Sequence, residues 1–257
     1  MAPSSASSAD VPYPDPIAYF RQAERRAAAL VAYRCTLVRQ ERLGLFARLS
    51  EPQRLAAIYR SNPLAVRFDW MDPASDLAQA SFIRGRYDDR VSLLPRRGFL
   101  GLPPVVSRFP PQDAITWGKA RNAITDFGVH RMLARTLDRL EQSPRWGGAK
   151  VRYVDRVRVE RTEALHFEIL YPAADTWPNK RQDLLFDVAR GLPLGTSLWL
   201  PDGRLDAAYF YMNLTPLPAP PPDGEFEITP PARRRSPSSQ PADRDPAPAE
   251  SLDSPQR

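Results

Sequence analysis

The strongest pattern along the chain is an alternation of apolar and polar residues that repeats in short segments. From Ala32, apolar residues recur at every second position until the polar run Arg39–Arg42. Such alternation is typical of a β-strand with one buried face. Further strands are predicted at residues 55–59, 64–71, 80–84 and 90–94, and then at 151–159, 165–171, 184–188, 195–200 and 207–214. Turn chemistry such as Ser61–Pro63 and Asp202–Gly203 separates them, so we expect antiparallel strands in series.

Two predicted helices accompany this series, one before the first strand and one between the two groups of strands. The first is predicted to start at Asp15–Pro16, a helix cap followed by proline, and to end near Leu30. The second is predicted to start at Thr125 or Asp126 and to stop at Ser143–Pro144. Each carries an apolar stripe at helical spacing, so each is expected to pack on something.

Composition narrows the class of protein. The chain has 257 residues, which fits one large domain or two small ones, and its 42% hydrophobic and 10% aromatic residues are enough for a sizeable core. The single cysteine, Cys35, excludes an internal disulfide, and the two histidines, His130 and His166, make a zinc site improbable. No apolar run approaches the roughly 20 residues that a membrane-spanning helix needs.

The net charge of +6 raises the question of nucleic acid as a partner. Only Lys119, Lys150 and Lys180 are lysines, so 33 of the 36 basic residues are arginines, and they are scattered along the chain. We therefore expect no nucleic-acid partner, because such binders gather their cations.

Both ends of the chain differ in composition from the middle. Residues 1–13 are small and polar and are expected to form a disordered leader without a visible signal peptide. Prolines are dense from Thr215 onward, and residues 232–257 are expected to form a disordered tail. The folded domain is thus predicted at residues 14–231. Because no signal peptide is visible, a cytoplasmic location is left open.

No known catalytic motif occurs in the sequence. Cys35 sits inside a strand alternation, which favours a buried thiol over a nucleophile. Glu41 and Asp69 could pair if their strands align, but each lies beside an arginine (Arg42 and Arg67), which favours ordinary cross-strand ion pairs. We therefore expect no enzyme, no catalytic residue, no metal and no cofactor.

Large apolar residues share faces of the predicted strands. Val66, Phe68 and Trp70 share one face, Phe167 and Ile169 another, and Tyr209 and Tyr211 a third. In the segment 151–159, all the odd-numbered residues are likewise expected to share one face. Such faces form a packed core, or they line an apolar groove on a curved sheet that holds an acyl chain.

The order of these segments also resembles a known bacterial family. The resemblance covers roughly residues 15–215, and its segments are Tyr33–Arg42, Ile58–Pro63, Val66–Trp70, Asp72–Pro73, Phe82–Gly85, Arg121–Gly128, Leu192–Pro193, Asp202–Gly203 and Tyr209–Asn213. The chain is identified by them as a member of domain-of-unknown-function family 1571 (DUF1571), which resembles the LolA/LolB-like outer-membrane lipoprotein carriers. Residues Phe226–Pro230 are similar to the closing strand-and-proline ending of those carriers.

This resemblance implies an α+β, β-rich fold: an incomplete antiparallel barrel whose mouth is plugged by helices. It also implies a non-catalytic protein of the periplasm or cell envelope that binds a lipid or a lipoprotein acyl chain. An interaction module similar to envelope stress regulators, with an envelope protein as partner, is the alternative. An unrecognised enzyme, with Glu41, His130 or His166 as acid or base, ranks last. One departure is Ala123, where the family usually has proline.

In such a barrel the bulkier alternate residues point inward and supply the cavity. The expected cavity residues are Leu37, Val66, Phe68, Trp70, Phe82, Leu93, Phe167, Ile169, Trp199, Tyr209 and Tyr211. The residues expected to close the mouth are Phe20 in the first helix and Met132, Leu133 and Leu137 in the second.

Overall fold

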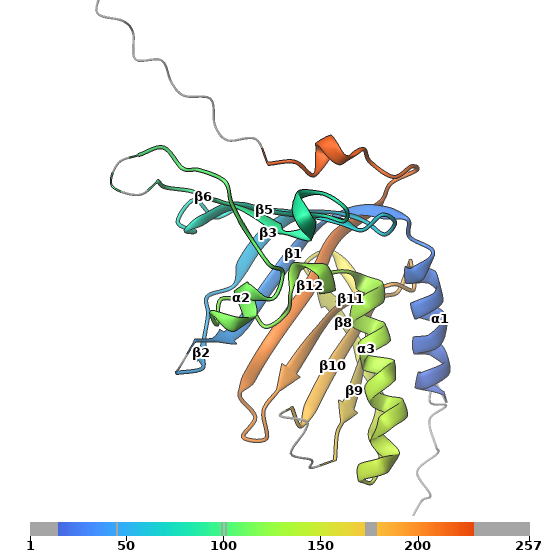
Figure 1. The fold of residues 1–257 in the computed structure, drawn as a ribbon. Coiled ribbons are helices and arrows are strands. Elements are labelled where there is room, and N and C mark those ends of the chain that lie inside the picture. Colours follow the sequence, from blue (N-terminus) through green and yellow to red (C-terminus); the bar gives the residue numbers. More distant parts are fainter. Residues whose placement is uncertain (1–14, 45, 99, 101, 173–178, 229–257) are drawn as a thin grey trace, which may run out of the picture.

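The alternating segments form one long antiparallel sheet in the computed structural model, which describes residues 15–228 except 45, 99, 101 and 173–178. The strands follow the order β7-β6-β5-β4-β3-β1-β12-β11-β10-β9-β8, and β2 pairs with β1 beside this path. The sheet curves and stays unclosed (Figure 1), which confirms the predicted incomplete barrel. The leader at 1–13 and the tail at 232–257 lie outside the described residues.

The predicted strands are present, with ends shifted by a few residues. The bounds are β1 Ala32–Leu43, β2 Arg48–Leu49, β3 Gln53–Arg60, β4 Ala65–Trp70, β5 Leu77–Ile83, β6 Val91–Pro95, β7 Ser107–Phe109, β8 Lys150–Val159, β9 Thr162–Leu170, β10 Arg181–Asp187, β11 Pro193–Trp199 and β12 Leu205–Pro216. The short strands β2 and β7 were not predicted. Strand β1 joins the two halves, because it pairs with β3 on one side and with β12 on the other.

The helices α1 (Pro16–Ala28) and α3 (Val129–Gln142) pack on each other beside the β8–β11 half of the sheet (Figure 1). The Asp15 side chain caps α1 by accepting a hydrogen bond from the Ala18 N–H at 2.9 Å, as predicted. Phe20, Ala23 and Ala27 are the buried face of α1. A third, short helix, α2 (Asp113–Thr116), lies between β7 and α3.

The start of α3 differs from the prediction. Residues Ile124–Asp126 form a separate 3₁₀ helix, and α3 begins after Gly128, whose φ is 140°. A side chain at Gly128 would also meet the Tyr59 ring at 3.4 Å. The chain thus turns sharply at the one residue type that tolerates this backbone, and the helix cannot start earlier.

The face assignment in 151–159 is wrong beyond the middle of the strand. A bulge between Tyr153 and Asp155 shifts the pairing of β8 with β9. Val151 and Tyr153 therefore pack into the main core, whereas Val157 and Val159 pack on the opposite face. One extra residue on a strand reverses the direction of every later side chain.

The segment after β12 crosses the outer face of β3–β5 as a strap, which we define as residues 217–228. Phe226 is buried there against Ile58, Ala65 and Ile83. The buried Arg60 guanidinium donates to the Pro221 carbonyl at 2.8 Å and to Asp223 at 2.7 Å. Phe226 follows a 3₁₀ helix, so the closing strand expected there is absent from the described part of the strap. The prolines of the strap lack the N–H groups that a strand needs.

The main core lies between the sheet and the two long helices. Phe20 of α1 contacts Phe167 and Phe186, with ring centroids 5.2 Å apart in both pairs. Among the described residues, none of the helices is both long and apolar enough to cross a membrane.

Candidate functional site

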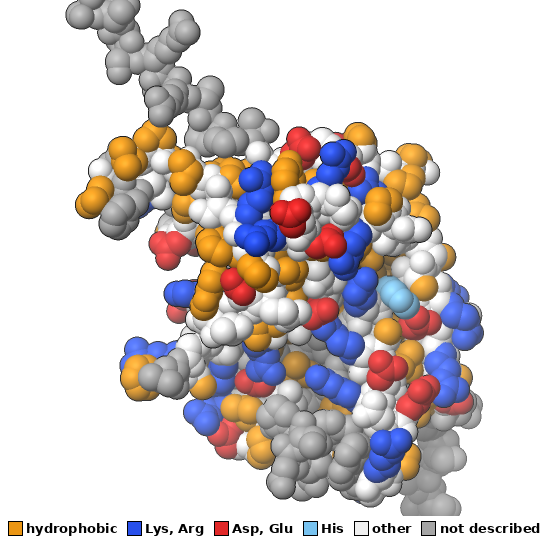
Figure 2. Space-filling model, in the orientation of Figure 1, with side chains coloured by type: hydrophobic (Ala, Val, Ile, Leu, Met, Phe, Trp, Pro, Cys, Tyr) orange, Lys and Arg blue, Asp and Glu red, His pale blue; other side chains and the backbone are white. Residues whose placement is uncertain are grey.

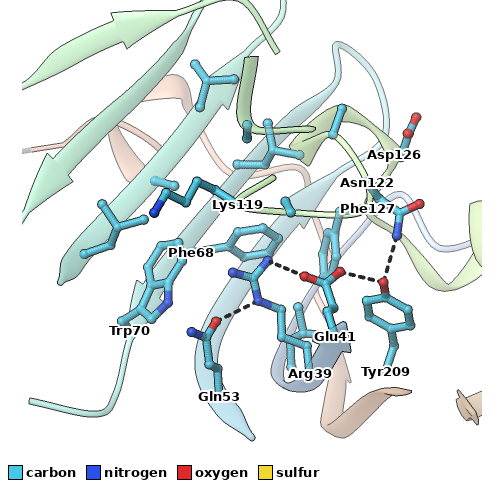
Figure 3. Close-up of a pocket in the computed structure, with 18 of the residues that line it drawn as sticks. Arg39, Glu41, Gln53, Phe68, Trp70, Lys119, Asn122, Asp126, Phe127 and Tyr209 are labelled. Carbon is cyan, nitrogen blue, oxygen red and sulfur yellow. Dashed lines mark hydrogen bonds and ion pairs between the residues drawn. The ribbon is translucent and has the colours of Figure 1, made fainter. Parts of the chain in front are cut away.

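A cavity of about 660 Å³ opens on the inner side of the sheet, beside β1 and β3–β6. Its walls come from this half of the sheet, from β11 and β12, from the segment 109–127, and from the first turns of α3. Figure 3 shows the aromatic and the polar residues that meet in it. The cavity therefore forms where the two halves of the sheet and the segment before α3 come together.

Aromatic side chains form much of the wall. Phe68 packs against Phe127 with ring centroids 4.9 Å apart and against Trp70 at 6.3 Å. Phe127 also lies 5.6 Å from Tyr211. These rings bring β4, β12 and the entry to α3 into contact, and they leave an apolar surface on the side of the void.

The segment between β7 and α3 covers the void from the other side. Phe109 and Trp117 make an edge-to-face pair at 5.0 Å, and both line the cavity. Trp117 remains 50% exposed, so it stands at the boundary between the cavity and solvent. The mouth is thus bordered by this segment, and α1, which was expected to help plug it, contributes no lining residue.

One end of the cavity holds a polar cluster around Glu41 (Figure 3). The Tyr209 hydroxyl donates to Glu41 Oε1 at 2.5 Å and accepts from the Asn122 side chain at 2.9 Å. Arg39 donates to Gln53 at 3.0 Å, and its Nη1 lies 3.9 Å from Glu41 Oε2. Burial and the neighbouring Glu41 carboxylate both raise the pKa of Tyr209, so the phenol keeps its proton.

A second polar group on the wall, the Gln182 amide, has hydrogen-bond partners for both its nitrogen and its oxygen. The Gln182 amide donates to Thr136 and to Thr196, both at 3.0 Å, and accepts from the Tyr171 hydroxyl at 2.7 Å. Burial raises the pKa of Tyr171 to about 12. This network ties α3 to β10 and β11 and holds the inner wall in place.

Six of the eleven expected cavity residues line the void, and so does one of the four expected to close its mouth. They are Leu37, Phe68, Trp70, Leu93, Tyr209, Tyr211 and Met132. These seven come from β1, β4, β6, β12 and α3, so the structure brings together residues far apart in the sequence.

The other expected residues do not line this cavity. Val66, Phe82, Phe167 and Ile169, with Phe20, Leu133 and Leu137 of the helices, are packed in the main core. Trp199 lies on the outer face, where its indole N–H donates to Asp183 at 2.6 Å and Arg181 stacks on its ring at 4.5 Å. A register shift between Leu198 and Trp199 accompanies this placement. Helices α1 and α3 pack over β8–β10 and fill the space there, so the cavity lies beside the other half of the sheet.

The residues weighed as catalytic candidates lie apart from the cavity, except Glu41. Cys35 is buried and burial raises its pKa to about 12. His130 links α3 to Glu24 of α1 at 2.9 Å, and His166 lies on the outer face, 3.1 Å from Asp155. Among the described residues, no group of three or more His, Cys, Asp or Glu side chains is placed to hold a metal ion.

The two carboxylates considered as a pair stay separate, because β3 lies between β1 and β4. Asp69 binds Arg67 on its own strand at 2.8 Å. Glu41 faces Arg39 and Tyr209 rather than the adjacent Arg42. Asp69 therefore forms an ion pair, as predicted, but with an arginine of its own strand and not across neighbouring strands.

Sequence reasoning missed the segment 109–127 and the polar residues Arg39, Asn122 and Gln182. The stretch from 96 to 124 carries no strand or helix periodicity. Its length was nevertheless a usable signal, because connections longer than about 15 residues are uncommon in compact domains and are usually either functional or linkers.

An unclosed antiparallel sheet with an apolar cavity on its inner side defines the chain as an open β half-barrel. More particularly, it belongs to the family described as protein of unknown function DUF1571, which matches residues 30–230. The match confirms the family resemblance of the sequence segments.

Solved structures of several bacterial proteins are similar to this chain. MucB is 15% identical, with a TM-score of 0.47, over 83% of this chain and 62% of that one. The Mycobacterium tuberculosis lipoprotein LppX is 12% identical, with a TM-score of 0.44, over 77% of this chain and 92% of that one. A LolA-superfamily protein from Nitrosomonas europaea is 10% identical, with a TM-score of 0.36, over 82% of this chain and 96% of that one. This chain thus spans 62% of the MucB chain. Similarity at this level carries no functional information. The curated proteins contain no significant match.

Proposed function

We propose that this protein is a non-catalytic binder of an acyl-chain amphiphile, held in the cavity between β1, β4 and the segment 109–127. The observation that carries the proposal is a void of about 660 Å³ with aromatic walls, open to solvent on one side. A solidly packed inner face would have argued against a carrier.

The size and the lining fit this class of ligand. Small-molecule sites are typically concave, about 300–1,000 Å³ in volume, and mostly apolar with a few placed polar groups. Each CH₂ group that leaves water contributes roughly 0.8 kcal/mol, so an alkyl chain along Phe68, Trp70 and Phe127 gains affinity by burial alone. The Glu41 cluster then lies where a polar head group would sit.

The resemblance to lipoprotein carriers supports a location in the periplasm or cell envelope, where the ligand would be a lipid or a lipoprotein acyl chain. Neither histidine lines the cavity among its described residues, which favours binding over catalysis.

Native mass spectrometry of the full chain purified from a bacterial host tests the proposal. We expect a retained lipid that organic solvent removes, and recovery of binding when the apolar fluorophore phenylnaphthylamine is added. A protein that carries no lipid, and whose fluorophore signal no dodecyl-chain amphiphile displaces, would refute the proposal.

Two matched substitutions separate the cavity from general effects. Ala80 lines the cavity from β5, so Ala80→Leu fills part of the void and is expected to weaken fluorophore binding about tenfold. Ala56 is exposed on β3, and Ala56→Leu adds the same volume outside the cavity. Equal binding by the two variants would contradict the assigned site.

An interaction module for an envelope protein is the second candidate. Leu100 is 84% and Leu102 66% exposed on the loop between β6 and β7, where apolar side chains gather at the upper left of Figure 2. Exposed apolar clusters are typical of contact surfaces. Replacing both leucines with serine should abolish cross-linking to a specific envelope protein and leave fluorophore binding unchanged. Cross-linking at wild-type level would remove this candidate.

A further inference from the structure

The most unusual polar group of the cavity is the Glu41 carboxylate. Glu41 is 2% exposed, and it lines the void from the far part of β1. Its Oε1 atom accepts the Tyr209 hydrogen bond, whereas Oε2 is buried and has no hydrogen-bond partner among the described residues. A buried acceptor without a donor is costly, and more so when it carries charge.

None of the protein donors around Oε2 makes a hydrogen bond to it among the described residues. The Arg39 Nε atom donates to Gln53, and its guanidinium lies 5.6 Å from the centre of the Trp70 ring. At 3.9 Å the Arg39 Nη1 atom is an ion-pair neighbour of Oε2 and is too far away for a hydrogen bond. The Asn122 amide already donates to Tyr209 (Figure 3).

The missing donor can therefore come from the contents of the cavity. We propose that Glu41 Oε2 accepts a hydrogen bond from a hydroxyl or ammonium group of the bound amphiphile, so that the site selects donor-bearing head groups. This inference rests on the proposed function, because it assumes that the alkyl chain of the ligand lies along the aromatic wall. A head group that carries only acceptors leaves Oε2 unpaired and places two acceptors face to face.

Ligands of one chain length isolate the head group. Monododecanoylglycerol has two hydroxyl donors, and methyl dodecanoate has the same acyl chain with no donor. We expect monododecanoylglycerol to displace phenylnaphthylamine from the wild-type full chain at about tenfold lower concentration than the methyl ester. Dodecylammonium should match or exceed the glyceride.

Glu41→Gln removes the charge and keeps the shape of the side chain. We expect it to reduce the preference for the donor-bearing ligands to about threefold or less, because a hydrogen bond to a charged acceptor is stronger than one to a neutral acceptor. Glu163→Gln is the matched control, since Glu163 is exposed on β9 and does not line this cavity. This control should keep the tenfold preference. If Glu41→Gln does not fold, Tyr209→Phe replaces it and should keep or increase the preference, because both carboxylate oxygens then lack a protein hydroxyl donor.

The outcomes are distinguishable. If none of the three amphiphiles displaces the fluorophore, the proposed function fails. If all three bind the wild-type protein equally, the cavity binds acyl chains and the inference about Glu41 is overturned, with water as the partner of Oε2. A donor preference that survives Glu41→Gln unchanged would also overturn it.

Discussion

Phe68 and Phe167 offer the sharpest test of where the core ends and the cavity begins. Both lie on inward faces of strands and both are buried. Phe167 of β9 is surrounded by rings, with Phe20 at 5.2 Å, Tyr19 at 5.5 Å and Phe186 at 5.6 Å. Phe68 of β4 has neighbours on one side and the void on the other.

Replacing each with alanine should separate stability from binding. Phe167→Ala leaves a new hole in a packed core and should cost about 3–5 kcal/mol of unfolding free energy. At about 2–4 °C per kcal/mol for a domain of this size, the melting temperature should fall by roughly 6–20 °C. Phe68→Ala enlarges an existing void, so mainly the transfer free energy is lost, about 1.5–3 kcal/mol.

Urea unfolding followed by circular dichroism gives the stabilities, and phenylnaphthylamine titration gives the binding. We expect Phe68→Ala to weaken binding at least fivefold, while Phe167→Ala leaves the affinity of the folded protein unchanged. A larger stability loss for Phe68→Ala than for Phe167→Ala, together with unchanged binding, would refute the division between core and cavity wall.

Four further predictions address groups outside the cavity wall or at its edge. A hydrogen bond with Asp183 raises the pKa of His166, so its protonated form stabilises the fold below about pH 6.5, and this contribution is lost as the pH rises through the raised pKa. The difference in unfolding free energy between wild type and His166→Gln is expected to be at most about 1 kcal/mol, because this group is partly exposed. In urea titrations this difference should shrink from pH 6 to pH 9, and a difference that grows would contradict the direction of the pKa shift. Because burial raises the pKa of Cys35 to about 12, Ellman's reagent should modify it only as fast as the protein unfolds, and rapid stoichiometric reaction of the folded protein would be inconsistent with this. Phe226→Ala should cost about 3 kcal/mol by loosening the strap, and a loss below about 1 kcal/mol in urea would show that the strap is not part of the core. Ala123 has φ −64°, which suits proline, and its N–H donates no hydrogen bond among the described residues. Ala123→Pro should therefore raise the unfolding free energy by about 0.4–1 kcal/mol. A lower melting temperature would show that the proline ring does not fit.

Much of the fold was predictable because its signals are local. Asp15 followed by Pro16 starts α1 where expected, since capping depends on neighbouring residues alone. The alternation around Cys35 and Leu37 likewise predicted β1 and its buried side. The family segments extended this local information to the order of the whole sheet.

Other features depend on contacts that are distant in the sequence. The late start of α3 follows from Gly128 lying against Tyr59, and the bulge at Tyr153 reverses the second half of β8. The Glu41 cluster requires β1, β12 and the segment before α3 to meet, and each of its polar residues is unremarkable on its own strand or loop.

The sequence by itself determined the longer strands, the two long helices, the family and the inward side of most strands, because period-two alternation and capping are properties of adjacent residues. Tertiary structure alone decided which inward residues meet protein and which meet a void. Phe68 and Phe167 have the same pattern, yet α1 and α3 together fill the space around Phe167, whereas on the side of Phe68 part of α3 borders a void. The other side faces the segment 109–127, whose course before α3 has no periodic signal in the sequence. The cavity is therefore a property of how the pieces pack, and alternation along a strand does not encode it.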